Sequence, residues 1–130
     1  MAELGMKWKL KAKYDDVLAQ VPERLKAEGF GVLTRIDVKA TLKEKLGVEF
    51  RRYQILGACN PKFANQALGM DLAIGVLLPC NVVVYEAYDG TTVLTAVDPM
   101  QTMAGQDARF TALAGEVREK LFRALAGMAT

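Results

Sequence analysis

Two cysteine–asparagine pairs are the residues of this chain whose types and spacing are best suited to chemistry. They are Cys59-Asn60 and Cys80-Asn81. A cysteine thiolate is a nucleophile and a ligand for soft metals, and an asparagine amide both donates and accepts hydrogen bonds. The two pairs therefore predict either a thiol-based site or a polar ligand-binding site, provided that the fold brings them together.

The thiol hypothesis depends on how two strands meet. The pattern predicts that Cys59 ends one strand and Cys80 begins the next, so antiparallel pairing would place both thiols at one edge of the sheet, within disulfide reach. A helix that starts just after Cys59, with Lys62 in its first turn, would lower the pKa of the Cys59 thiol. On this hypothesis the protein has a thiol redox or sulfur-handling role, with Cys59 attacking and Cys80 resolving.

The alternative is that both cysteines are structural, because unpaired cysteine is often buried as a small apolar side chain. Two thiolates do not complete a zinc site, so no metal site is predicted. Asn60 precedes Pro61 and is placed to cap a helix. Asn81 begins an apolar strand, where its amide either binds a ligand or ties two loops together.

The composition narrows the classes of function. The chain has 130 residues with no histidine and no serine, which excludes Ser-His-Asp and Cys-His catalytic arrangements. Charged residues make up 25%, and a net charge of +2 is too small to indicate a nucleic-acid or membrane partner. The N-terminus has no apolar segment typical of a secretory signal, so we expect a cytoplasmic protein with reduced thiols.

A row of lysines suggests a weaker alternative, an anion or nucleic-acid binding face. Apolar and basic residues alternate over residues 7–14, which predicts a half-buried strand. Its outer face would carry Lys7, Lys9, Lys11 and Lys13. No aromatic residue is interleaved on that face for base stacking, and lysines also protect edge strands from aggregation, so nucleic acid is not expected as a partner.

The remaining elements must position these residues. In the first half of the chain we predict a strand at 7–14, a helix capped by Asp15 or Asp16 and ended by Gly29, a strand at 30–38, and a helix at 39–46 with Leu42 and Leu46 inward. A strand at 50–59, a helix from Pro61 and a further turn within 71–79 follow. The chain then forms strands at 80–87 and 91–97, joined by a hairpin at Asp89-Gly90, and ends in a helix at 106–128. Pro22 either starts or kinks the first helix.

This order predicts an α+β fold in a single domain over residues 1–130. We expect a two-layer sandwich with a mainly antiparallel five-stranded sheet covered on one face by helices. The long C-terminal helix should lie across that sheet. Its buried stripe is predicted to be Phe110, Leu113, Val117, Leu121, Leu125 and Met128.

Three stretches of the chain resemble one family. They are YQILGACNP at 53–61, IGVLLPCNVVVYE at 74–86 and GFGVLTRIDV at 29–38, and Asp98-Pro99 follows the last predicted strand. Together they resemble the prokaryotic domain of unknown function 302 family. The resemblance implies a TBP-like α+β sandwich, often a homodimer, and implies no established activity.

The prediction from the sequence is a binding domain that pairs with itself and is not an enzyme. Its candidate site is the sheet edge where Cys59 and Asn60 meet Cys80 and Asn81, because two polar, sulfur-bearing turns converge there between apolar walls. A small ligand or a partner's peptide is the expected occupant, and the sequence names no cofactor.

Overall fold

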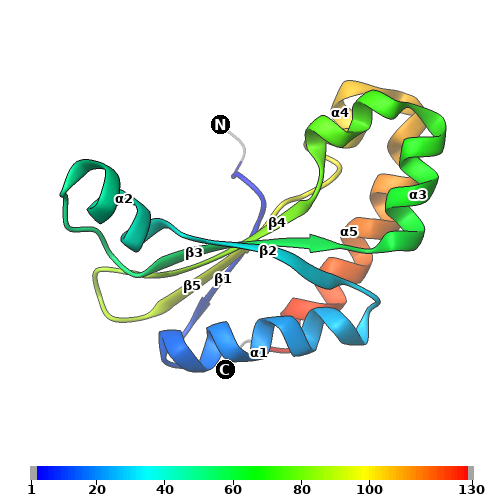
Figure 1. Ribbon diagram of the computed structural model, residues 1–130. Helices are drawn as coiled ribbons and strands as arrows, with labels where there is room; N and C mark the ends of the chain where they lie inside the picture. The colour runs from blue at the N-terminus through cyan, green and yellow to red at the C-terminus, as the bar shows by residue number, and fades with distance from the viewer. Residues whose placement is uncertain (1–2, 129–130) are drawn as a thin grey trace.

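The computed structural model describes residues 3–128, and Figure 1 shows the arrangement of its elements. In chain order they are β1 (Met6–Leu10), α1 (Tyr14–Ala27), β2 (Gly31–Asp37), α2 (Val38–Leu46), β3 (Tyr53–Cys59), α3 (Pro61–Met70), the 3₁₀ helix η1 (Leu72–Leu77), β4 (Cys80–Glu86), β5 (Thr92–Ala96), α4 (Met103–Gln106), the 3₁₀ helix η2 (Ala108–Phe110) and α5 (Thr111–Ala126).

The strands form a five-stranded sheet in the order β1-β5-β4-β3-β2, and every neighbouring pair is antiparallel. The predicted hairpin joins β4 to β5. Gly90 has a positive φ of 83°, which glycine adopts without steric cost. The Asp89 carboxylate accepts hydrogen bonds from the amide and the hydroxyl of Thr91, at 3.0 and 2.6 Å, which fixes the turn.

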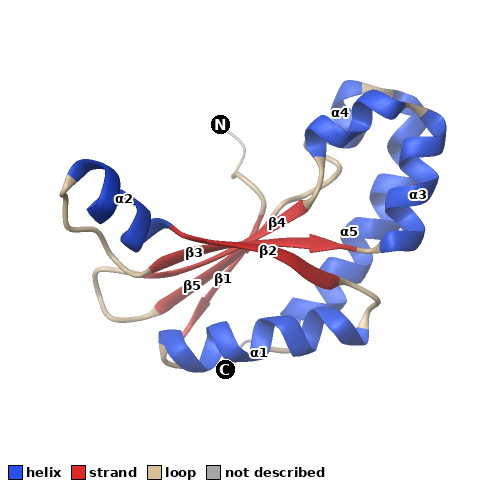
Figure 2. Ribbon diagram, in the orientation of Figure 1, coloured by secondary structure: helices blue, strands red, loops and turns tan. Residues whose placement is uncertain are grey.

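Helices α1 and α5 cover one face of this sheet, as Figure 2 shows, and the hydrophobic core lies between the two layers. Leu56, Val82 and Leu94 point into the core from three adjacent strands. The stripe predicted for the C-terminal helix is buried at every position. The prediction of a two-layer α+β fold with a mainly antiparallel five-stranded sheet is therefore confirmed.

The first strand is shorter than predicted. It ends at Leu10, and Tyr14 is the first residue of α1 instead of the last residue of the strand. The alternation over 7–14 is compatible with Tyr14 either in the strand or in the helix. Tyr14 belongs to the helix because its buried side chain extends the stripe of Val17 and Val21 into the core. The helix starts at Tyr14, so the predicted caps Asp15 and Asp16 lie in its first turn, and it runs through Pro22 without a break.

Helix α2 lies at the end of the sheet away from α3 and α4 (Figure 1). It has no fully buried residue, and Leu46 is 70% exposed, so the prediction that Leu46 faces inward is wrong, whereas Leu42 is half-buried. The amphipathic pattern is present, but α2 projects beyond the layer formed by α1 and α5, so nothing in that layer packs on it. The helix at the C-terminus begins at Thr111 rather than 106, because Asp107 caps a separate 3₁₀ turn.

Candidate functional site

A cavity of about 370 Å³ lies where β3 ends and β4 begins, between this end of the sheet and helices α3 and α5. Buried apolar side chains form its inner wall, among them Phe30, Phe63, Leu113 and Val117. They come from segments far apart in the chain, which Figure 1 shows converging at one end of the molecule. The cavity is therefore a product of the tertiary fold.

The hollow exists because small residues occupy inward positions of the elements around it. Ala58 on β3 and Ala67 on α3 are fully buried and line it, and Ala64 is half-buried on the same helix. Pro61 is at the first helical position, as predicted, so α3 starts directly from the end of β3. Larger side chains at these alanine positions would fill the space that the cavity occupies.

Both cysteines line this cavity and both are free thiols. Strands β3 and β4 are antiparallel, as the thiol hypothesis requires, but the residue opposite Cys80 is Ala58 and not Cys59. Burial raises the pKa of the Cys80 thiol to about 11, and the nearby Cys59 adds to this shift. Cys80 is therefore a neutral thiol at physiological pH.

Asn60 lies at the cavity wall and occupies the predicted N-cap position of α3. Its side chain makes no capping hydrogen bond. Its Nδ2 instead donates to the carbonyl oxygen of Glu28 at 3.3 Å, so it ties the connection between α1 and β2 to the start of α3. The adjacent Gly29, with φ of +88°, leaves room for this amide.

Replacing Asn60 by alanine should lower the free energy of unfolding by about 1 kcal/mol, because the hydrogen bond to the Glu28 carbonyl is lost. Chemical denaturation of the variant and of Asn65→Ala, an exposed position on the same helix, measures the difference. An effect no larger than that of Asn65→Ala would show that the bond between the two loops adds nothing to stability.

Asn81 lies outside the cavity. Successive strand residues point to opposite faces, so Cys80 points inward and Asn81 outward. It is exposed opposite Gly57, and its backbone carbonyl accepts a hydrogen bond from Val97 at 3.0 Å. The structure thus brings Cys59, Asn60 and Cys80 to one cavity and leaves Asn81 apart.

Thr34, Gly57 and Met103 were not anticipated at this site from the sequence. Thr34 and Pro79 line the cavity and lie against Gly57, where an added Cβ would come within 2.8 Å of the Pro79 Cγ and would also collide with the Thr34 hydroxyl. Met103 closes the cavity from α4. A glycine within an otherwise apolar strand was the one available signal, since it marks a close approach of other groups.

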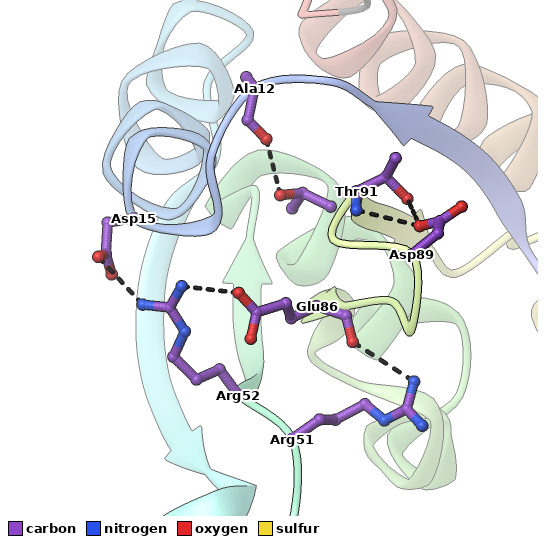
Figure 3. A network of polar contacts seen from close by, with 8 residues as sticks. Ala12, Asp15, Arg51, Arg52, Glu86, Asp89 and Thr91 are labelled. Carbon is purple, nitrogen blue, oxygen red and sulfur yellow. Dashed lines mark hydrogen bonds and ion pairs between the residues drawn. The ribbon is translucent and has the colours of Figure 1, made fainter.

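The opposite end of the sheet is held by a polar network (Figure 3). Arg52 donates to Glu86 at 2.8 Å and to Asp15 at 3.0 Å, and its guanidinium lies over the ring of Tyr14. The hydrogen bond from Arg52 lowers the pKa of Glu86. Arg52 and Glu86 are half-buried, and the network joins α1 to the strand ends, so we assign it a structural role.

The predicted face of four lysines does not form, because Lys11 and Lys13 follow the end of β1. Lys7 and Lys9 are on the strand, and each has an acidic partner: Glu3 at 4.0 Å and Asp89 at 2.7 Å. The ion pair with Lys9 and the hydrogen bonds from Thr91 hold the pKa of Asp89 far below its usual range. Much of the positive charge expected on this face is therefore neutralised.

Comparison with known proteins places the chain in a family. The family described as "Domain of unknown function DUF302" matches residues 6–128. This chain belongs to the DUF302 family. A crystal structure of an uncharacterized conserved DUF302 protein from Bacillus stearothermophilus is 31% identical in sequence, with a TM-score of 0.87 over 96% of this chain and 98% of that chain. The comparison with curated proteins found no match.

The resemblance read from the sequence is confirmed, and it extends further than the segments that suggested it, since the DUF302 match includes β1 and α5. The family description assigns no activity, so the function of this DUF302 protein has to be argued from its geometry. Within residues 3–128 no helix is long and apolar enough to cross a membrane. The same residues contain no cluster of three or more histidine, cysteine or acidic side chains able to hold a metal ion.

Proposed function

We propose that this DUF302 protein is a binding domain for a small, largely apolar molecule, which it holds in the cavity without converting it chemically. The observation that supports this proposal is the cavity itself. Its inner wall is apolar, and three polar side chains, Thr34, Cys59 and Asn60, lie on the strand β2 and β3 side. The ligand that fits such a lining has an apolar body and one end able to form hydrogen bonds.

The size and polarity of the cavity favour such an occupant over water. Its volume of about 370 Å³ lies within the range of about 300–1,000 Å³ found for small-molecule sites. A buried water needs two to four polar partners, which the inner wall of Phe63, Leu113 and Val117 does not offer. An apolar ligand gains roughly 25 cal/mol for each Å² of apolar surface that it removes from water.

The chemistry of the lining supports binding rather than catalysis. Among the residues that line the cavity, the only titratable side chains are the two thiols. A general acid or base works best with a pKa near the operating pH, whereas burial raises the pKa of Cys80 to about 11. We place the protein in the cytoplasm, where both thiols would stay reduced.

The cavity is expected to bind decan-1-ol, an amphiphile chosen as a probe, and Ala64→Phe should weaken that binding at least about tenfold by filling the space. Shifts of the Leu113 and Val117 methyl resonances on titration measure the affinity. The probe should also raise the melting temperature of the wild type, since a ligand that binds only the folded state stabilises it.

Ala126→Phe is the matched control, because Ala126 is also a half-buried helical alanine but does not line the cavity. It should bind the probe like the wild type. The proposal is wrong if decan-1-ol and other small amphiphiles leave the cavity methyl resonances unchanged, or if Ala64→Phe binds the probe as tightly as the control does.

A second candidate function is thiol redox or sulfur chemistry with Cys59 attacking and Cys80 resolving. The observation in its favour is that both thiols are free, line one cavity and are close enough for Cys59 to affect the pKa of Cys80. The offset in strand register and the raised pKa of Cys80 weigh against it, since a resolving thiol must ionise to attack. The reactivity of Cys80 decides between the two functions.

A further inference from the structure

The start of helix α3 lies at the cavity and has no side-chain cap. Asn60 lines the cavity at the N-cap position, but its amide donates to the carbonyl oxygen of Glu28 and makes no capping hydrogen bond. Pro61 has no N–H group, and the backbone N–H groups of Lys62 and Phe63 have no hydrogen-bond partner among the described residues. The first N–H groups of a helix need partners from outside the helix. Two backbone donors are therefore open to a ligand at this end of the cavity.

The thiol of Cys80 is a further donor that has no partner in the same cavity. Cys80 is only 9% exposed and lines the cavity, and its thiol makes no hydrogen bond with the described residues. Its raised pKa keeps the proton on the sulfur at physiological pH, so the side chain offers a weak S–H donor and no negative charge. It is paired with Ala58, the residue before Cys59, and so lies close to the start of α3. A ligand that accepts hydrogen bonds would satisfy this buried group.

The charges around the start of α3 favour an anion. No acidic side chain lines the cavity. The carboxylate of Glu28, whose carbonyl Asn60 contacts, is compensated by Arg123 at 3.3 Å and by Lys120 at 4.0 Å. The N-terminus of this ten-residue helix carries a partial positive charge, and Lys62 adds a full charge in the first turn. An anionic head group therefore meets attraction here and no opposing charge within the cavity lining.

The lining also indicates how an amphiphile would be oriented. Thr34 is exposed on β2 and Cys59 is half-buried, so solvent reaches this side of the cavity. Met103, Leu113 and Val117 are buried and belong to the apolar wall. Removing a charge from water costs more free energy than removing a neutral polar group. A charged head group is therefore expected at the side that solvent reaches, beside α3, with the apolar chain against the buried wall.

We propose that the ligand is a single-chain aliphatic carboxylate, whose carboxylate accepts hydrogen bonds from the backbone N–H groups of Lys62 and Phe63, with the Cys80 thiol as a further donor. This inference rests on the proposed ligand-binding function and adds the identity of the head group. The volume of about 370 Å³ lies near the lower end of the range of about 300–1,000 Å³ for small-molecule sites, which favours one short chain.

A series of head groups on one chain tests this proposal with the wild-type protein. Decanoate, decan-1-ol and decylammonium are titrated below the concentrations at which they form micelles, and the Leu113 and Val117 methyl resonances measure the affinity. Decanoate should bind at least about tenfold more tightly than decan-1-ol, because hydrogen bonds to an ionised acceptor are roughly twice as strong as neutral ones. Decylammonium should bind more weakly than decan-1-ol, since its charge faces the positive end of the helix. Acetate should not bind at the same concentrations, because it has no chain to bury.

The position of the carboxylate has its own readout in the same titrations. Decanoate should shift the backbone amide proton resonances of Lys62 and Phe63 further than decan-1-ol does, since the charged oxygen accepts the stronger hydrogen bond. This measurement needs no substitution, so it does not depend on whether any variant folds.

Asn60→Asp tests the position by competition. Aspartate has nearly the shape of asparagine and is a preferred N-cap residue, so its carboxylate would accept from the free N–H groups and place a like charge beside the ligand. Decanoate should then bind at least about tenfold more weakly, whereas decan-1-ol should lose much less. Asn65→Asp is the matched control, because it makes the same change of charge at an exposed position of α3 that does not line the cavity. It should bind decanoate nearly as the wild type does.

Equal affinities for decanoate and decan-1-ol would overturn the carboxylate inference and leave the proposed function standing. Decanoate that binds Asn60→Asp as tightly as Asn65→Asp, or leaves the two amide resonances unshifted, would overturn the placement of its head group at α3. If Asn60→Asp does not fold, the amide shifts decide the placement. If neither decanoate nor decan-1-ol shifts the cavity methyl resonances, the proposed function fails and the carboxylate inference fails with it.

Discussion

Gly57→Ala is expected to lower the free energy of unfolding by about 1–3 kcal/mol. This is the reverse of the usual effect, since replacing a glycine within a helix or strand by alanine normally stabilises the folded protein. An added Cβ would lie within 2.8 Å of the Pro79 Cγ and would collide with the Thr34 hydroxyl. The proline ring cannot rotate away, so the backbone at the end of β3 or before β4 must move. Chemical denaturation, followed by tryptophan fluorescence, measures the loss.

Gly115→Ala is the control for this substitution, because a Cβ at Gly115 in α5 would meet nothing within 4 Å. It should stabilise the protein by about 0.5–1 kcal/mol, through the higher helix propensity of alanine. Combining Gly57→Ala with Thr34→Ala should recover part of the loss, since one of the two collisions is then removed. Equal effects at Gly57 and Gly115 would show that the close approach of Thr34 and Pro79 has no energetic role.

The two cysteines are expected to differ in reactivity near neutral pH, with Cys80 at least about one hundred times less reactive than a fully exposed free thiol. Burial raises the pKa of the Cys80 thiol to about 11, so near neutral pH its thiolate fraction is roughly one hundred times smaller than that of an ordinary free thiol. Burial also shields Cys80 from reagents, so its alkylation should follow the opening of the fold. Cys59 is half-buried at the cavity wall and should react first.

Iodoacetamide labelling, followed by intact mass, measures this difference on two single-cysteine variants, Cys59→Ala and Cys80→Ala. The rate at Cys80 should keep rising with pH until about 11, because only the thiolate reacts. Decan-1-ol should slow the labelling of Cys59 if the ligand fills the cavity that Cys59 lines. Rapid labelling of Cys80 below pH 9 in the folded protein would contradict the expectation and favour the redox function instead.

Several features of the fold could be predicted because their signals are local. The hairpin at Asp89-Gly90 follows from the φ that glycine tolerates, and the start of α3 follows from Pro61 at a helical N-terminus. The buried stripe of α5 could be predicted because apolar residues recur along the chain at the spacing that places them on one side of a helix. At residues 7–14 the local pattern is compatible with two boundaries, because Tyr14 fits both the alternation of the strand and the buried stripe of the helix. The sequence therefore did not decide where the strand ends and the helix begins.

The candidate site was predicted in part for the same reason. Cys59 and Cys80 were expected at one sheet edge, since the end of one antiparallel strand lies near the start of the next, and the structure places both at the cavity. Asn81 was expected beside them but points to the other face. The alternation of side chains along a strand puts Asn81 on the face opposite Cys80. The strand predicted at 80–87 already implied this separation, which the expectation of a shared site did not take into account.

By itself, the sequence determined the α+β class, the order of the elements and the apolar stripes that bury the core. Only the tertiary structure decided that α2 projects without a buried face, that Thr34 and Pro79 close over Gly57, and that a cavity opens between β3, α3 and α5. The physical reason is that caps, turns and periodicity act between near neighbours in the chain. A cavity is the space left over by the packing of distant segments, and its volume depends on all of them at once.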